Sequence, residues 1–212
     1  MKIAIIGSGN VGGGLAAAAT KAGHDVVVSA ANPASAQETA AKAGARAAAT
    51  NREAVQGADA VVLAVPHGAV AQVVADLGAD LDGKTLIDAT NPLNDSYSDL
   101  TTSGVSAAEA LQQQAPSANV VKALNTVFAG RYANPTEDGQ PLDGFLAGDD
   151  AAAKTRVAEL VASLGLRPVD LGGLRMARTL EELAFANISL NAGNGWAWQS
   201  AFRLVGPQTP VA

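Results

Sequence analysis

The sequence predicts an α/β fold built on a doubly wound, mostly parallel sheet. Short runs rich in β-branched residues alternate with alanine-rich segments along most of the 212 residues, and this alternation is typical of parallel sheets covered by helices. The first run, residues 2–6, has the composition of a buried strand. A glycine-rich turn follows it directly, and residues 15–21 then favour a helix. We therefore expect a strand, a tight turn and a helix at the start of the chain.

The turn has the spacing G-x-G-x-x-G, the fingerprint of dinucleotide-binding βαβ units. Its residues, all expected to contact a cofactor, are Gly7, Ser8, Gly9, Asn10, Val11 and Gly12. The first glycine permits the tight turn, the second lets the backbone approach a pyrophosphate, and the third lets the helix pack on the strand. The phosphates would lie at the positive end of the helix. The alternative is a turn without a ligand, but its place between a strand and a helix favours a Rossmann dinucleotide-binding domain.

The elements that follow continue the alternation. The expected strands cover residues 26–28, 46–49, 60–65, 84–88, 119–122, 145–147 and 167–170. The expected helices cover residues 33–43, 51–57 with a cap on Asn51, 68–77, 106–114 and 149–164. The alternation of strands and helices has one weak break, a predicted loop at residues 134–143. We expect a dinucleotide-binding domain over residues 1–140 and a small C-terminal extension of strand and helix over residues 141–212, which would cover the substrate.

The last region begins with residues 179–182, Thr-Leu-Glu-Glu, a capping box that predicts a helix start. Asn187, Asn191 and Asn194 share one face if this helix continues, because they are spaced at i, i+4 and i+7. Glycine costs about 1 kcal/mol relative to alanine inside a helix. Gly193 and Gly195 therefore indicate that something packs against the backbone, either the sheet or a flat ligand ring.

The apolar residues around Trp196, Trp198 and Phe202 have two interpretations. They fill a core, or they cover a partner in a homodimer. The predicted substrate contacts of this region are Asn187, Asn191, Gly193 and Trp196.

In an open α/β sheet, ligands bind beyond the carboxyl ends of the strands. The expected cofactor contacts at these ends, besides the glycine turn, are Ser29, Asn32, Val65, Pro66, His67, Asn91 and Pro92. Asn125 follows the strand at residues 119–122 and is an expected substrate contact. Its amide and that of Asn91 are able to orient a nicotinamide or substrate ring. The alternative is turn capping, a common role of asparagine before proline.

The loop after the second strand bears on the choice between NADP and NAD. A 2′-hydroxyl is usually held by an acid about 20 residues beyond the glycines, and a 2′-phosphate by an arginine. Residues 29–32, Ser-Ala-Ala-Asn, contain neither. The residues alone therefore leave both nucleotides open.

We assign no catalytic residue. Carbonyl reduction usually needs a proton donor beside the hydride site, but neither Tyr97 nor Tyr132 is followed four residues later by a lysine, as a short-chain dehydrogenase would require. His67 is a candidate acid, although helix entry is its commoner role. Lys122 is a candidate cationic substrate contact, but we expect it instead to extend from its strand end into water. Direct hydride transfer between stacked rings needs positioning rather than a strong acid, and the amides and glycines fit that chemistry better.

Composition excludes several classes of partner. The formal net charge of −6 argues against nucleic acids and anionic membranes. The absence of cysteine excludes disulfides, thiol chemistry and cysteine-ligated metals, and we expect no metal site. No apolar stretch is long enough to span a bilayer, and the chain opens on a core strand rather than a signal peptide. We expect a cytoplasmic protein that acts on a small molecule.

Several stretches resemble deazaflavin-dependent NADP oxidoreductases. They are Gly-Ser-Gly-Asn-Val-Gly at 7–12, Ala-Gly-His-Asp-Val-Val-Val at 22–28, Val-Val-Lys-Ala-Leu-Asn-Thr at 120–126 and Asn-x-x-x-Asn-x-Gly-x-Gly at 187–195. The resemblance covers nearly the whole chain, and the last two stretches are its more specific part. It implies NADP as cofactor, a deazaflavin coenzyme as second substrate, and hydride transfer between stacked rings. The second ring would be covered by the loops near Pro66, Asn91 and Asn125 and by the C-terminal region.

The same domain is similar to the cytosolic part of six-transmembrane metalloreductases, which use NADPH and a flavin. Two departures from the deazaflavin family concern the ligands. Ala30 and Ala31 stand where the family has a serine and an arginine for the 2′-phosphate, so NAD is not excluded. Asn125 stands where the archaeal members have a histidine. The alternatives to deazaflavin reduction are reduction of a flavin, quinone, imine or carbonyl, and a non-catalytic dinucleotide-binding redox sensor.

Overall fold

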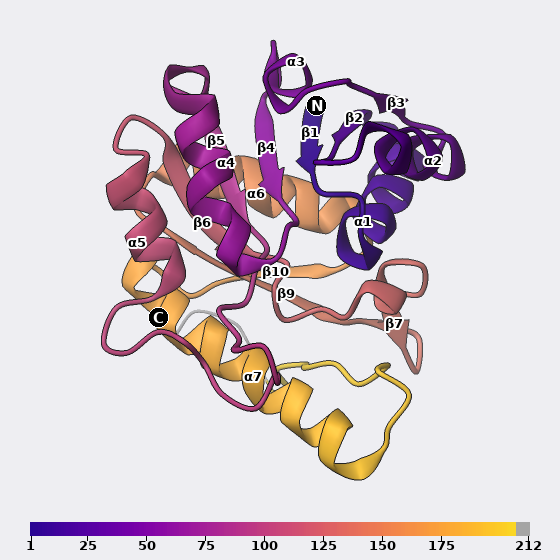
Figure 1. Ribbon diagram of the computed structural model, residues 1–212. Helices are drawn as coiled ribbons and strands as arrows, with labels where there is room; N and C mark the ends of the chain where they lie inside the picture. Colours follow the sequence, from indigo (N-terminus) through magenta and orange to yellow (C-terminus); the bar gives the residue numbers. More distant parts are fainter. Residues whose placement is uncertain (207–212) are drawn as a thin grey trace, which may run out of the picture.

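A single sheet organises the computed structural model, which describes residues 1–206 (Figure 1). It has eight strands in the order β10-β9-β6-β5-β4-β1-β2-β3. The strands are β1 (Lys2–Ile6), β2 (Asp25–Ser29), β3 (Arg46–Ala47), β4 (Ala60–Leu63), β5 (Thr85–Asp88), β6 (Asn119–Ala123), β9 (Asp143–Gly148) and β10 (Arg167–Asp170). Neighbouring strands run parallel except for β6 and β9, which are antiparallel. The doubly wound, mostly parallel sheet predicted from the sequence is confirmed.

Helices cover both faces of the sheet. They are α1 (Asn10–Lys21), α2 (Pro33–Ala43), α3 (Asn51–Val55), α4 (Val70–Leu77), α5 (Ala107–Gln114), α6 (Ala151–Ser163) and α7 (Ala177–Asn194), with 3-10 turns η1 (His67–Ala69), η2 (Gly78–Leu81), η3 (Ala129–Tyr132) and η4 (Leu174–Met176). Alternate strand residues point to opposite faces. Ile3 and Ile5 accordingly join the core under α1, α2 and α6, whereas Ala4 and Ile6 join the core under α3, α4 and α5. Within residues 1–206, no helix has the length and apolar character needed to cross a membrane.

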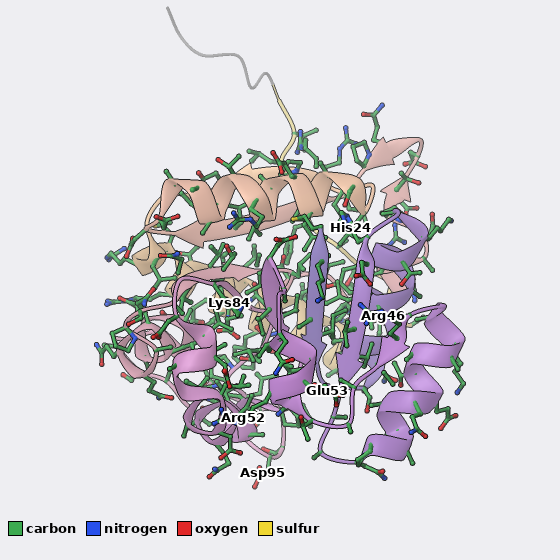
Figure 2. The ribbon with its side chains drawn as sticks, turned by 90° about the horizontal axis from the view of Figure 1, so that it is seen from above. His24, Arg46, Arg52, Glu53, Lys84 and Asp95 are labelled. Atoms are coloured by element: carbon green, nitrogen blue, oxygen red, sulfur yellow. The ribbon has the colours of Figure 1, made fainter. Side chains whose placement is uncertain are left out.

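The sheet has a topological switch point between β1 and β4, because the chain adds β2 and β3 on one side of β1 and β4 to β6 on the other. Ligand crevices form beyond the carboxyl ends of the strands at such a point. In Figure 1 these ends point downward, and α7 lies across them at the bottom of the view. Figure 2 looks onto the opposite edge, where His24, Arg46 and Lys84 lie at the starts of β2, β3 and β5.

The C-terminal part of the chain extends the same sheet before it forms α7. Strand β9 pairs with β6, and β10 pairs with β9. Ahead of β9, β7 (Thr136–Glu137) and β8 (Gln140–Pro141) form a hairpin around Asp138 and Gly139, which have φ of 50° and 72°. The predicted C-terminal extension of strand and helix is present, and a division of the chain at residue 140 into two domains stays a prediction.

Two predicted helix starts are wrong in detail. Thr50 rather than Asn51 caps α3, since the Thr50 hydroxyl oxygen accepts a hydrogen bond from the Glu53 amide at 3.1 Å. The capping box predicted at Thr179 is not formed, because α7 begins at Ala177. Glu181, in the same stretch, is buried in the interior with 1% of its surface exposed.

Candidate functional site

The turn between β1 and α1 requires glycine at two positions. Gly7 has φ of 125°, and a Cβ there would lie 2.2 Å from the Ala64 carbonyl oxygen. A Cβ on Gly12 would lie 2.0 Å from the Gly7 carbonyl oxygen. At Gly9, by contrast, a Cβ would meet no described atom within 4 Å. The first and third glycines therefore serve packing, and the second leaves open space beside the backbone.

The loop after β2 carries only neutral side chains. The Ser29 hydroxyl donates to Asn51 Oδ1 at 2.8 Å, and Asn32 Oδ1 accepts from the Ala34 amide at 3.0 Å as the cap of α2. Ala31, between them, is exposed. The next three cations along the chain are engaged elsewhere, in the ion pairs Lys42–Glu38, Arg46–Asp25 and Arg52–Asp80. The position that would meet a 2′ group thus has hydrogen-bonding groups and no charge of its own.

A cavity of about 980 Å³ lies at the carboxyl ends of the strands. Its walls come from the glycine turn, from the loops after β5 and β6, and from α7 with the segment that follows it. They are mostly apolar, and Phe128 and Trp198 meet edge to face with ring centroids 5.4 Å apart. Of the residues described, those lining the cavity include no Asp, Glu, His, Lys or Arg.

Two asparagines tie the loops after β5 and β6 together inside this cavity. Asn125 Nδ2 donates to Asn91 Oδ1 at 2.9 Å and to the Leu180 carbonyl at 3.0 Å, while Asn91 Nδ2 donates to the Asn125 carbonyl at 3.0 Å. Asn125 Oδ1 and the neighbouring Thr126 Oγ1 are buried and have no hydrogen-bond partner among residues 1–206. Buried polar atoms are normally paired, so these two are left for a ligand or water.

The backbone that carries Asn125 is held in an uncommon conformation. Leu124 has φ of 66°, in the left-handed region that non-glycine residues rarely adopt. Its carbonyl accepts a hydrogen bond from the Tyr132 hydroxyl at 2.9 Å. Burial raises the pKa of Tyr132 well above its usual value, which keeps the phenol protonated as a donor. Strained residues of this kind cluster at binding sites, where the surroundings fix them.

A buried ionic cluster lies directly behind the asparagines. Lys122 Nζ contacts Asp88 Oδ2 at 2.9 Å, Glu181 Oε1 at 3.1 Å and the Thr90 carbonyl at 2.7 Å, and its side chain has 0% of its surface exposed. The Ala107 amide at the start of α5 also donates to Glu181, at 3.1 Å. The expectation that Lys122 extends into water is therefore wrong. The lysine joins β5, β6 and α7 beneath the cavity floor.

A family model described as "NADP oxidoreductase coenzyme F420-dependent" matches residues 2–92. The F420-dependent NADP reductase of Methanothermobacter thermautotrophicus is 32% identical over 213 residues, covering 92% of this chain and 90% of that protein. The chain belongs to the F420-dependent NADP reductase family. This confirms the resemblance found in the sequence and makes the protein a member of an oxidoreductase family.

Two further proteins are similar to this chain, one by its solved structure and one by its sequence. The crystal structure of a putative F420-dependent NADP-reductase from Arthrobacter sp. FB24 has a TM-score of 0.83 and 33% identity, and the match covers 93% of this chain and 96% of that one. The metalloreductase STEAP3 of Rattus norvegicus is 31% identical over 183 residues, covering 86% of this chain but 36% of that protein.

Of the predicted substrate contacts near the end of the chain, some lie at the cavity and others do not. Asn187 lines the cavity, and Asn191 beside it holds the following segment by accepting from the Trp198 amide at 3.1 Å. Gly193 and Trp196 do not line the cavity, and beyond its own stretch of helix no described atom lies within 4 Å of a Cβ on Gly193. Trp198 lines it instead, a residue that the sequence did not single out as a contact.

Val65, Pro66 and His67 follow β4 beside the glycine turn rather than in the cavity wall. His67 Nδ1 is buried and has no partner among the described residues. Pro92 is buried behind Asn91, and Ser8 offers its carbonyl to the Thr39 hydroxyl at 3.1 Å. Ligand contacts of Ser8, Val65, Pro66, His67 and Pro92 stay predictions.

Proposed function

We propose that the protein is an NADP-dependent oxidoreductase that exchanges a hydride with a deazaflavin coenzyme. Its relatives are named for both ligands. The observation that carries the proposal is the continuity between the glycine turn and the cavity, since Asn10 and Val11 belong to both. A dinucleotide whose pyrophosphate lies on the turn would have its nicotinamide end directed to the cavity.

The turn fits the pyrophosphate of such a dinucleotide. The open space beside Gly9 lies where α1 begins, and the free amides of a helix N-terminus bind phosphate groups. The neutral loop after β2 fits a ribose, with Ser29, Asn32 and Asn51 as hydrogen-bonding groups.

The cavity fits flat rings. Its volume lies at the upper end of the range for small-molecule sites, which is about 300–1,000 Å³. Apolar walls exclude water, and the unpaired oxygens of Asn125 and Thr126 supply the few polar contacts that fix orientation. When bound, the nicotinamide and the deazaflavin supply the redox chemistry, and the protein supplies position and a dry environment. A cavity wall without a charged acid or base suits the hydride step itself, which moves no proton; the proton that completes reduction of the deazaflavin would be taken from solvent.

The test is anaerobic deazaflavin absorbance with purified protein and either NADPH or NADH. Enzyme-dependent bleaching is the expected result. Gly9→Ala should keep the wild-type melting temperature, because its φ of −74° suits alanine and the Cβ has space. It should nevertheless bind NADPH at least tenfold more weakly, because the methyl group occupies the approach of the pyrophosphate.

Gly13→Ala is the matched control for that variant. Its Cβ would lie 3.5 Å from a Thr39 methyl carbon, an ordinary contact, so nucleotide affinity should stay unchanged. Absence of bleaching with either nucleotide, despite nucleotide binding, would refute the deazaflavin assignment. Turnover with a flavin, quinone, imine or carbonyl would then support the second hypothesis, and binding without any turnover would support a redox sensor.

We also propose that the protein forms a homodimer and works in the cytoplasm. Trp196 and Trp198 have 48% and 45% of their surfaces exposed, which supports a homodimer that covers the end of α7. Light scattering after size exclusion is the test, and a monomer at working concentration would refute it. We expect the protein to work in the cytoplasm on small molecules.

A further inference from the structure

The orientation of the Asn125 amide is fixed by its neighbours. Nδ2 has two hydrogens, and both are used, one by Asn91 Oδ1 and the other by the Leu180 carbonyl. A carbonyl only accepts hydrogen bonds, so the nitrogen has to face Leu180. The oxygen, Oδ1, is consequently the one atom of this side-chain amide left to face a ligand.

That oxygen is buried and unpaired. Asn125 has 7% of its surface exposed, it lines the cavity, and its Oδ1 has no partner among residues 1–206. A buried acceptor without a donor is unfavourable, and native proteins rarely keep one without a use. Because the oxygen only accepts, a ligand that satisfies it has to present an N–H or O–H group.

The supports behind Asn125 prevent the oxygen from turning away. Lys122 holds the Thr90 carbonyl next to Asn91, and its ion pair with Glu181 anchors the helix turn that carries the Leu180 carbonyl. Both partners of Nδ2 are therefore fixed by the same buried lysine. The left-handed conformation of Leu124 fixes the backbone on the other side.

We propose that Asn125 is a specificity-determining residue whose Oδ1 accepts a hydrogen bond from an amide or lactam N–H of the ring in the cavity. This rests on the proposed function for the identity of the rings. The shared chemistry has two sources: the carboxamide –NH₂ of nicotinamide and the pyrimidinedione N–H of a deazaflavin. The unpaired Thr126 hydroxyl is able to donate, so the two residues together offer the complement of an amide.

The experiment removes the donor from the ligand and leaves the protein intact. Dissociation constants are measured for NADPH against its 3-acetylpyridine analogue, which lacks the –NH₂ group, and for a deazaflavin against its N3-methyl derivative. The wild type should bind one of the two analogues about 5- to 100-fold more weakly than its parent, the cost of a buried acceptor left unpaired. The pair that shows the loss identifies the source of the donor.

Asn125→Ala should reduce that ratio to about twofold or less, because no oxygen is left to satisfy. Asn194→Ala is the matched control: its amide donates to Leu190 on the exposed side of α7, so the wild-type ratio should persist. If Asn125→Ala fails to fold by circular dichroism, the wild-type ratios decide alone.

Wild-type ratios near one for both ligand pairs, or equal losses in wild type and Asn125→Ala, would overturn the inference. The binding ratios do not depend on turnover, so the two proposals fail separately. If the binding ratios are as expected but no deazaflavin is bleached, the proposed reaction is refuted and the Asn125 assignment stands. If deazaflavin is bleached but no binding ratio exceeds one, the Asn125 assignment is refuted and the proposed reaction stands.

Discussion

Replacement of Lys122 by methionine tests the buried ionic cluster. The variant keeps the length of the side chain but leaves the carboxylates of Asp88 and Glu181 without their cation, each with 2% of its side chain exposed. The amides of Ala107 and Ala108 still donate to Glu181 at 3.1 Å and 3.3 Å, which offsets part of the loss. Removing one partner from a buried ion pair costs about 3–5 kcal/mol.

The expected result is a large fall in melting temperature. In a chain of this size 1 kcal/mol corresponds to about 2–4 °C, so Lys122→Met should melt about 6–20 °C below wild type. Circular dichroism at neutral pH measures it. Adding Glu181→Gln to the variant should recover part of the loss, because one buried carboxylate fewer is left uncompensated.

Lys154→Met is the matched control for this prediction. Lys154 pairs with Asp170, whose side chain has 48% of its surface exposed, and such surface pairs contribute about 0–1 kcal/mol. Its melting temperature should fall by no more than about 4 °C. A Lys122→Met variant that melts together with this control would refute the argument, since it would mean that the two carboxylates are not held out of water.

Two further predictions concern the nucleotide and acid stability. Ala31→Arg should raise the affinity ratio of NADPH to NADH by about tenfold or more, because a charged hydrogen bond to the 2′-phosphate is added to an uncharged loop; an unchanged ratio would show that this loop does not meet the 2′ group. The side-chain hydrogen bond from Arg178 lowers the pKa of Glu109 from 4.5 to about 2, so this pair stabilises the fold fully above pH 4.5 and loses its effect as the pH falls towards 2. The difference in melting temperature between wild type and Glu109→Gln should shrink across that interval, and a constant difference would contradict it.

The glycine turn was predictable because its determinants are local. Residues 7–12 specify the turn by their spacing, and the close approach of Gly12 to the Gly7 carbonyl is what that spacing demands. The positions of Asn91 and Asn125 at strand ends were predictable too, whereas their mutual hydrogen bonds were not predicted. Both residues stand just beyond strands that a doubly wound sheet places side by side.

The environment of Lys122 was not predictable by the same reasoning. Its partner Glu181 lies far along the chain on α7, and no local pattern indicates that this helix buries a carboxylate beneath the sheet. The capping box predicted at Thr179 is wrong for another reason: the 3-10 turn at Leu174–Met176 leads directly into α7 at Ala177, so Thr179 already lies inside the helix. Trp198 was missed because the chain reverses after Gly195, which has φ of 64°, and carries the second tryptophan back to the cavity.

The attachment of α7 has a consequence for how ligands arrive and leave. Leu180 and Glu181 are fastened to β6 by buried contacts, so the helix cannot swing outward as a lid without separating an ion pair from its partners. Ligands would then enter through the rim of a crevice whose α7 wall stays in place. Discrimination between one ring and another would rest on the contacts inside the crevice rather than on closure of this helix.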